Sequence, residues 1–314
     1  MTVQAPPVRP ESRSDAGVPG NSRTIPRHGR LTPYLFLAPF AVLFIGFVLV
    51  PAIFGLWVSL HDYNYLLPGQ PWVGLQNYLD LFTPGSRDSG DFWHSMLATG
   101  IFTVLSVPFL IVCPLGVALL LNRAFRGRSF FRAVFFAPYV LGVSVVGLLF
   151  RFLLDPNIGL VNSYLGHAIP WTTDVPWAWV SLVAMTVWWT LGFNAIIYLA
   201  GLQEISPELY EAAEVDGASR WDQFRNVTLP GLRPVVAFVT TVTLLASANM
   251  FGQAFLVTKG APANETRTAI MYIASTGLGS NRQGMAAAMS YILAIILIGI
   301  SALNLRLSRR REAS

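Results

Sequence analysis

The sequence predicts an all-α integral membrane protein with six transmembrane helices. Its 314 residues are 54% hydrophobic and only 12% charged, whereas about 25% of residues are charged in an ordinary soluble domain. Six apolar stretches reach the roughly 20 residues that a helix needs to cross the bilayer core. The short alternating segments typical of a β-barrel do not occur in the sequence. The six stretches are residues 34–60, 97–121, 133–154, 177–202, 235–257 and 285–305.

The first 33 residues are rich in Pro, Ser, Gly and Arg and have no hydrophobic period. This composition predicts a disordered cytoplasmic tail. The apolar run over 34–60 exceeds the roughly 7 to 15 residues of a cleaved signal, so we expect the first span to be retained, with kinks at Pro39 and Pro51. The predicted layout is a tail over 1–33, a membrane domain over 34–305 and a basic tail over 306–314.

The arginines predict the orientation of the spans, because short loops rich in Arg and Lys stay in the cytoplasm. Most arginines lie in the two tails and in the second and fourth loops, so both termini and the segment 203–234 are expected on the cytoplasmic side. The net charge of +5 then reflects topology, and no nucleic-acid partner is expected. These arginines are Arg9, Arg13, Arg23, Arg27, Arg30, Arg123, Arg126, Arg128, Arg132, Arg220, Arg225, Arg233, Arg306, Arg309, Arg310 and Arg311.

The predicted spans contain no Asp, Glu, His or Lys. Intramembrane ionisable residues usually mark proton relays or ion-coupling sites, so a secondary carrier or a membrane-embedded enzyme lacks its chemistry here. Arg151 is the exception, and Asp155 one turn later predicts an i, i+4 ion pair. No metal site is expected, because Cys113 is the only cysteine and the four histidines are far apart.

ATP chemistry is also not expected of this chain itself. A phosphate-binding loop requires G-x-x-x-x-G-K-[ST], and the only lysine, Lys259, lies outside any such pattern. We therefore expect no cofactor on this chain. If transport is driven by ATP, then ATP and Mg²⁺ belong to a partner subunit.

The cytoplasmic segment 203–234 is a polar island between two apolar runs. Ser206-Pro207 predicts the start of a short helix and Gly217 its end. Ser219 predicts the cap of a second helix with Asp222, and Leu229-Pro230 its end. Acidic residues concentrate over 204–222, which disfavours an interfacial helix on anionic lipid and favours a protein partner.

This segment resembles a known motif. Glu211-Ala212-Ala213, then Gly217, then Val227-Thr228-Leu229-Pro230 is similar to the EAA loop of permease subunits in bacterial ABC importers, E-A-A-x3-G-x9-I-x-L-P, with valine in place of isoleucine. The resemblance implies that Glu211, Ala212, Ala213, Gly217, Leu229 and Pro230 belong to a coupling helix that docks on an ATPase subunit.

Other stretches resemble the carbohydrate branch, which includes the maltose and glycerol-phosphate permeases. They are WVGLQNYLDLF, RGRSFFRAVFFAPYVL, DPNIGLVNSYL and FGQAFLVTKGAPANETRT, although many relatives have TGGGP where this chain has TKGAP. The resemblance implies a type I importer fold in the inner membrane, with a core of about 93–305 and a first helix that embraces a second, usually different, permease. It also implies two ATPase subunits and an extracytoplasmic sugar-binding protein.

Uncharged polar residues mark a candidate substrate path in the fourth, fifth and sixth spans. Hydroxyls, amides and aromatic faces suit a sugar, although such groups can also serve only to hydrogen-bond neighbouring helices. Thr186 and Ser247 follow the same pattern. The candidates are Trp188, Trp189, Thr190, Asn194, Tyr198, Asn249, Gln253 and Tyr291.

These observations predict a non-catalytic permease subunit of an ATP-driven sugar importer. An alternative is a permease for another small polar solute such as a glycerol-phosphate ester, for which a cation in the path is expected. A secondary carrier or a membrane-bound enzyme is disfavoured by the uncharged spans.

Overall fold

The computed structural model describes residues 32–312. This part of the chain is helical apart from loops and one isolated antiparallel bridge between His61 and Trp72. The chain divides into two units, Met1–Pro51 and Ala52–Ser314. The predicted tail over 1–33 lies, except for its last two residues, outside the described residues.

The first apolar helix begins in the first unit and runs on into the second, which starts at Ala52. Helix α1 (Thr32–Phe44) continues through Pro39 into a π-helical turn over Ile45–Leu49, and α2 (Val50–Ser59) follows. The wider turn lies directly before Pro51, which has no N–H to donate to the preceding turn.

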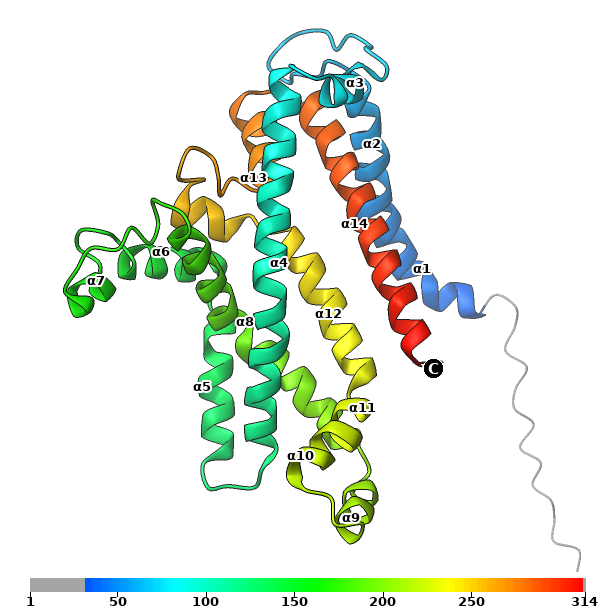
Figure 1. Cartoon of the computed structure of the whole chain (residues 1–314). Helices are drawn as coiled ribbons and strands as arrows, with labels where there is room; N and C mark the ends of the chain where they lie inside the picture. Colours follow the sequence, from blue (N-terminus) through cyan, green and yellow to red (C-terminus); the bar gives the residue numbers. More distant parts are fainter. Residues whose placement is uncertain (1–31, 313–314) are drawn as a thin grey trace, which may run out of the picture. The chain divides into compact units, whose positions relative to one another are not determined.

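The second unit contains the remaining helices (Figure 1). They are α3 (Gln76–Phe82), α4 (Arg87–Asn122), α5 (Arg128–Val140), α6 (Val143–Leu153), α7 (Leu160–Leu165), α8 (Trp177–Glu204), α9 (Pro207–Val215), α10 (Arg220–Gln223), α11 (Leu229–Gly231), α12 (Arg233–Ala248), α13 (Ala269–Ala274) and α14 (Gln283–Glu312). Helix α14 extends through the part of the predicted basic tail that the structure describes.

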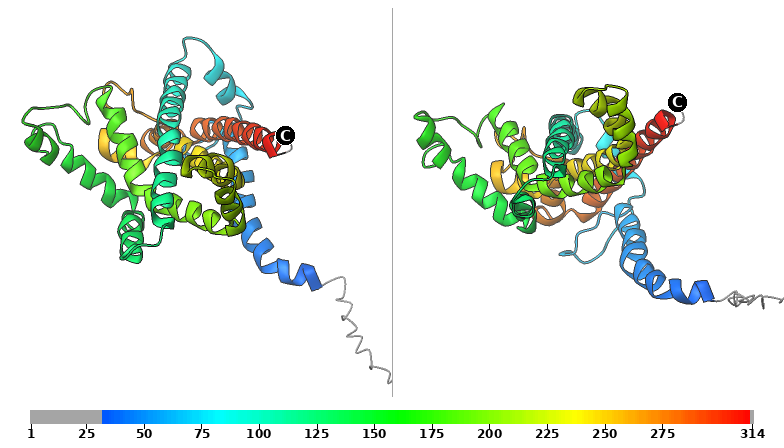
Figure 2. Two further views of the ribbon diagram at one scale, coloured as in Figure 1. Left: turned by 60° about the horizontal axis from the view of Figure 1, so that its bottom comes forward. Right: turned by 90° about the horizontal axis from the view of Figure 1, so that it is seen from below.

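Helix α4 is the central element of this unit. Its 36 residues make a rod of about 54 Å, longer than the bilayer core of about 30 Å. It contributes to three buried clusters, represented by Phe92, Phe102 and Leu121 along its length. In Figure 1, α3 and α13 lie at its upper end, and α9 and α10 lie at the opposite end. All views place α5, α6 and α7 on one side of α8 and α14 on the other (Figure 2).

Four of the six predicted spans are single helices long and apolar enough to cross a membrane: Tyr34–Ser59, Arg87–Asn122, Trp177–Glu204 and Gln283–Asn304. The other two predicted spans are interrupted. The stretch 133–154 is divided between α5 and α6, which meet at 95°. The stretch 235–257 is divided between α12 and a π-helical turn over Ala254–Thr258. The prediction of an unbroken apolar helix is therefore wrong at these two places.

The break between α5 and α6 consists of two extended residues, Leu141 and Gly142. Pro138 lies in the last turn of α5 and removes one backbone donor. The carbonyl of Leu141 accepts a hydrogen bond of 2.9 Å from the indole Nε1 of Trp189 on α8. Irregular backbone at membrane depth requires such a partner, so α8 stabilises the break.

The break after α12 is stabilised in a similar way. Helix α12 ends at Ala248, and the Met250 carbonyl accepts a hydrogen bond of 2.7 Å from the buried Thr268 hydroxyl. The Thr99 hydroxyl of α4 accepts a hydrogen bond of 2.9 Å from the backbone N–H of Ala269. Side chains distant in sequence therefore hold this irregular segment.

Helices α5 and α8 pack with their backbones close together at Gly192. A Cβ atom at this position would lie 2.1 Å from the carbonyl oxygen of Phe135. Only glycine fits this approach, as is common where membrane helices pack closely. Gly192 thus brings α5 against the polar face of α8.

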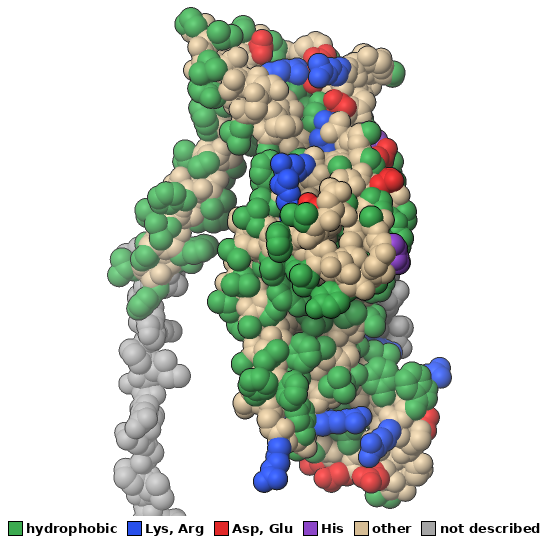
Figure 3. All heavy atoms as spheres, turned by 90° about the vertical axis from the view of Figure 1, so that its left-hand side faces the viewer, with side chains coloured by type: hydrophobic (Ala, Val, Ile, Leu, Met, Phe, Trp, Pro, Cys, Tyr) green, Lys and Arg blue, Asp and Glu red, His purple; other side chains and the backbone are tan. Residues whose placement is uncertain are grey.

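Figure 3 shows the side of the molecule on which α5, α6 and α7 lie. Hydrophobic side chains cover much of the middle of this face, and the charged side chains gather mostly toward its ends. This distribution is that of a protein embedded in a bilayer.

Candidate functional site

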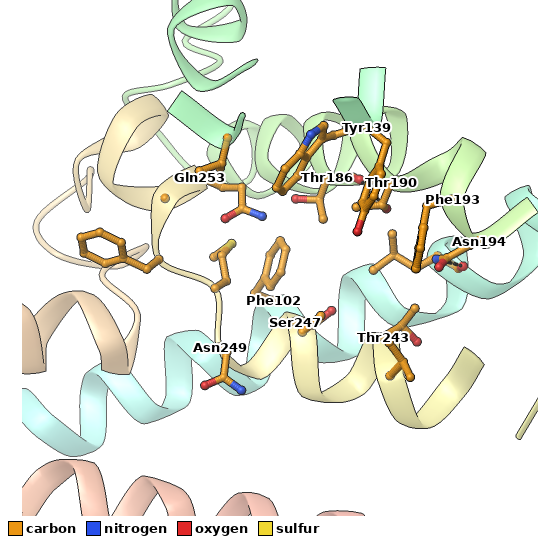
Figure 4. A pocket seen from close by; sticks show the side chains of 18 residues that line it. Phe102, Tyr139, Thr186, Thr190, Phe193, Asn194, Thr243, Ser247, Asn249 and Gln253 are labelled. Carbon is orange, nitrogen blue, oxygen red and sulfur yellow. Dashed lines mark hydrogen bonds between the residues drawn. The ribbon is translucent and has the colours of Figure 1, made fainter. Parts of the chain in front are cut away.

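A cavity of about 330 Å³ lies between α4, α5, α8 and the end of α12. Its lining contains no Asp, Glu, Lys, Arg or His. Figure 4 shows side chains from several of these helices converging on it. The lining residues are Phe102, Leu110, Tyr139, Val143, Thr186, Trp189, Thr190, Phe193, Asn194, Val242, Thr243, Ala246, Ser247, Asn249, Met250, Phe251, Gly252 and Gln253.

Three threonines of the cavity donate their hydroxyl protons to their own helices. Thr186 donates to Leu182 O at 2.8 Å and Thr190 to Thr186 O at 2.8 Å. On α12, Thr243 donates to Val239 O at 2.6 Å. These bonds leave only the oxygen lone pairs of the three hydroxyls for a ligand.

Two polar side chains of the cavity have no hydrogen bond to any described residue. They are the amide of Gln253 and the hydroxyl of Tyr139. Asn194 is nearly buried, and its Nδ2 donates weakly to Leu110 O at 3.3 Å. Its amide oxygen accepts no hydrogen bond from residues 32–312. Gln253, Tyr139 and Asn194 therefore offer both donors and acceptors to a bound molecule.

Aromatic rings supply the apolar part of the cavity. Tyr139 of α5 stacks on Phe193 of α8 with ring centroids 4.5 Å apart, and Trp189 lies 6.2 Å from Tyr139. Apolar ring faces beside uncharged polar groups suit a ligand that has both C–H and O–H surfaces.

The structure brings together five of the eight predicted path residues: Trp189, Thr190, Asn194, Asn249 and Gln253. Asn249 lies at the edge, since its amide donates to Leu245 O at 2.8 Å and points away from Gln253 in Figure 4.

The other three predicted path residues lie elsewhere. Trp188 faces an apolar groove and packs on Phe150, because it is one position off the polar face of α8. Tyr198 is completely buried in the cluster around Leu199 and Leu232. Tyr291 of α14 donates to the Ala52 carbonyl. None of the three lines the cavity.

Sequence reasoning missed Tyr139 and Phe193 as residues that line the cavity. Both residues lie in apolar runs of the sequence, where an aromatic ring is as common in a lipid-facing or packed position as in the lining of a cavity. Their role depends on the bend after α5 and on the approach at Gly192, which the sequence pattern does not show.

The segment 203–234 forms a helical hairpin at the end of the unit opposite α3. Helix α9 has Pro207 in its first turn, as predicted, although the Ser206 side chain makes no capping bond. Gly217 adopts a left-handed φ of 77° after α9. Ser219 and Asp222 form the predicted capping box of α10. These bonds, above all from the Ser219 hydroxyl, hold the pKa of Asp222 below its usual value.

The second helix of the segment ends at Gly231, one residue after the predicted end at Leu229-Pro230. The chain stays helical through Pro230 to Gly231, because proline is tolerated in the first turn of α11. The direction changes after Gly231, where α12 begins at 65° to the preceding helix. The Tyr210 hydroxyl lies 3.0 Å from that of Thr228, which links α9 to the second arm of the hairpin.

The hairpin exposes a mixed surface. Val215 is 88% exposed and Trp221 is 67% exposed, and Glu211 and Ala212 of α9 are also exposed. A hollow beside them is lined by Tyr210 and Trp221 together with residues from the end of α4. Exposed large apolar groups next to a hollow mark an interaction surface.

The opposite end of the unit is held by ion pairs. Asp88 accepts two bonds of 2.8 Å from Arg282. Arg267 lies 2.9 Å from Asp91 and 4.5 Å from the ring centre of Tyr272. These contacts tie the loop before α13 and the start of α14 to α4.

The ion pair predicted between Arg151 and Asp155 is not among the pairs within 4.0 Å in the described residues. Asp155 instead accepts backbone N–H bonds from Asn157 at 2.9 Å and Ile158 at 3.1 Å. These two bonds lower the pKa of its carboxyl group.

Comparison with known proteins identifies the family. Residues 83–312 match the family described as "Binding-protein-dependent transport system inner membrane component". The chain belongs to this family. It is therefore an inner-membrane transport component of the ABC importer permease class, as the EAA-like spacing predicted.

Relatives of this permease extend over nearly the whole chain. The lactose transport system permease protein LacF of Rhizobium radiobacter is 32% identical over 299 residues, covering 92% of this chain and 98% of LacF. The arabinooligosaccharides transport system permease protein AraP of Bacillus subtilis is 32% identical over 287 residues, covering 89% of each.

A solved structure matches the permease over most of its length. It is a bacterial ABC transporter involved in the import of the acidic polysaccharide alginate, with a TM-score of 0.76 and 26% identity, and it covers 88% of this chain and 95% of that chain. The match supports the importer permease fold.

Proposed function

We propose that this chain is a permease subunit of an ATP-driven, binding-protein-dependent sugar importer and that its cavity is part of the sugar path. The observation that carries the proposal is the uncharged cavity in a member of a permease family whose relatives are named for lactose and arabinooligosaccharides. Hydroxyls, amides and stacked rings match the alternating O–H and C–H surfaces of a neutral sugar.

The alternative solute, a glycerol-phosphate ester, fits the cavity less well. A buried phosphate requires a cation or several N–H donors. The lining contains neither Arg nor Lys. A neutral sugar needs no such compensation.

The helical hairpin is proposed as the dock for an ATPase subunit. The EAA-like residues Glu211, Ala212 and Ala213 lie on α9, and exposed Val215 and Trp221 lie beside them. Small alanines allow close approach, and the apolar groups provide area for burial. ATP and Mg²⁺ are assigned to that subunit and no cofactor to this chain.

The remaining assembly follows from the family. We assign a second, different permease, an extracytoplasmic sugar-binding protein and bilayer lipid as partners. The hairpin and both termini are placed in the cytoplasm, and the interrupted stretches are counted among six spans. The hairpin lies at one end of the second unit and α3 and α13 lie at the other end, which supports this topology (Figure 1).

A single hydroxyl tests the sugar path. The chain is reconstituted in proteoliposomes with the ATPase, second permease and binding protein encoded beside it, and uptake of labelled neutral oligosaccharides is measured. Tyr139→Phe removes a hydroxyl that has no hydrogen-bond partner in the part of the chain that the structure describes, so the fold should be retained. We expect a several-fold loss of uptake, because one hydrogen bond contributes about 0.5–1.5 kcal/mol.

The matched control is Tyr164→Phe, since Tyr164 is 85% exposed and lies outside the cavity. Uptake should be unchanged in this variant. Equal uptake by the wild type and Tyr139→Phe would remove the hydroxyl from the path. ATP-independent uptake would contradict the importer assignment itself.

A further inference from the structure

The segment from the end of α4 to the first turns of α5 carries a cluster of four arginines within ten residues. No Asp or Glu occurs between residues 123 and 154, so the cluster has no acidic neighbour along the chain. None of the four takes part in the ion pairs within 4.0 Å among the described residues. The cluster consists of Arg123, Arg126, Arg128 and Arg132.

Two of these arginines are partly buried without compensation. In both Arg128 and Arg132, Nε and one terminal nitrogen are covered by protein but have no hydrogen-bond acceptor among the described residues. Partial removal of a cation from water is unfavourable unless an anion accompanies it. The i, i+4 spacing places the two guanidinium groups on one face of α5. This face therefore attracts an anion.

The surroundings of the cluster indicate where the anion comes from. Phe125, Phe130 and Phe131 are 42%, 67% and 45% exposed, so aromatic rings stand on the surface among the arginines. Aromatic and basic side chains together are typical of the membrane interface. The cluster follows the end of α4, where an apolar helix surface gives way to charge.

We propose that Arg128 and Arg132 bind the phosphate of an anionic phospholipid, with the exposed phenylalanine rings against its acyl chains. The planar guanidinium groups match the oxygens of a phosphate diester. An acidic surface on another protein would not require exposed rings at the same place. The proposal is independent of the transported solute and of the ATPase dock.

The experiment measures lipid binding to the full chain by native mass spectrometry, titrating phosphatidylglycerol into chain purified in phosphatidylcholine. The Arg128→Gln/Arg132→Gln variant should bind phosphatidylglycerol about 25-fold more weakly, or about fivefold for each arginine. The matched control is Arg225→Gln/Arg233→Gln, which removes the same charge from two exposed arginines of the cytoplasmic loop. Its affinity should stay within about twofold of the wild type.

Three outcomes would overturn the proposal. Unchanged affinity in the Arg128/Arg132 variant would show that these side chains do not hold the lipid. Equal loss in the control would show a general charge effect without a site. Competition by soluble glycerophosphoglycerol at the same concentration as the lipid would show a phosphate site that makes no use of acyl chains.

A second variant covers a failure to fold and the alternative of a protein partner. Arg128→Lys/Arg132→Lys keeps the charge but loses the planar fork, and an intermediate affinity is expected. If Arg128→Gln/Arg132→Gln folds and binds lipid like the wild type but no longer co-purifies with other transporter subunits, the arginines contact protein and the lipid site is refuted.

Discussion

Gly217 offers a direct test of the proposed ATPase dock. It adopts φ of 77° between α9 and α10, and no atom lies within 4 Å of a Cβ built at this position. The cost of Gly217→Ala therefore comes only from the backbone, because a left-handed conformation costs a residue with a Cβ about 1–2 kcal/mol. Asn tolerates this conformation better, so Gly217→Asn should be milder.

The expected effect follows from this energy. A cost of about 1–2 kcal/mol reduces the population of the observed turn by about 5- to 30-fold relative to competing turns. If the ATPase binds the observed hairpin, its affinity should fall by up to the same factor. Gly116→Ala is the control, since Gly116 lies in α4 with no atom within 4 Å of its built Cβ and alanine favours a helix.

The assay is binding of the purified ATPase subunit to the reconstituted chain, together with sugar-stimulated ATP hydrolysis. Both readouts should decline in the order wild type, Gly217→Asn, Gly217→Ala, while Gly116→Ala stays at the wild-type level. Binding and hydrolysis at the wild-type level in Gly217→Ala would refute the link between this turn and the dock.

Four further outcomes are expected. Gly192→Val should lower the melting temperature in detergent, because its Cβ would meet the α5 backbone at 2.1 Å and overpacking costs about 1–3 kcal/mol; an unchanged melting temperature would contradict the close approach. Ser219→Ala should speed hydrogen exchange in α10, since loss of a cap costs about 1 kcal/mol. The pKa of Asp222 is lowered, so its ionised carboxylate stabilises α10 fully at any pH above the usual carboxyl range. This stabilisation is lost as the pH falls through the lowered pKa. Amide hydrogen exchange in wild-type α10, corrected for intrinsic rates, should therefore rise only in acid. Asp88→Asn removes the pair with Arg282 and should cost about 1 kcal/mol in thermal unfolding, because Arg282 is about half exposed and screened; no change would show that the pair does not stabilise the fold.

The sequence predicted the polar face of α8 and missed the bends that complete the cavity. Thr186, Thr190 and Asn194 recur every four residues, so helical periodicity places them on one face wherever the helix lies. The breaks at Leu141 and after Ala248 depend on hydrogen bonds from Trp189 and Thr268, which lie far away in sequence. Hydrophobicity alone does not distinguish such a break from a continuous span.

The hairpin was predicted more completely than the cavity because its signals are local. The proline start, the left-handed glycine and the capping box each depend on residues a few positions apart. Tyr291 shows the opposite case, since its hydroxyl bonds to a carbonyl 239 positions away. No local pattern distinguishes that contact from a place in the path.

The threonine hydroxyls of the cavity can accept hydrogen bonds from a ligand but cannot donate them. Thr186, Thr190 and Thr243 each donate their hydroxyl proton to a carbonyl of their own helix. Each oxygen can therefore accept a hydrogen bond from a ligand, and no proton is left to donate. A molecule bound beside them must bring its own protons, as a free sugar does at every hydroxyl. A sugar whose hydroxyls are methylated keeps its shape and ring faces, but it places oxygen lone pairs against the lone pairs of the threonine oxygens. We expect the cavity not to bind such a sugar.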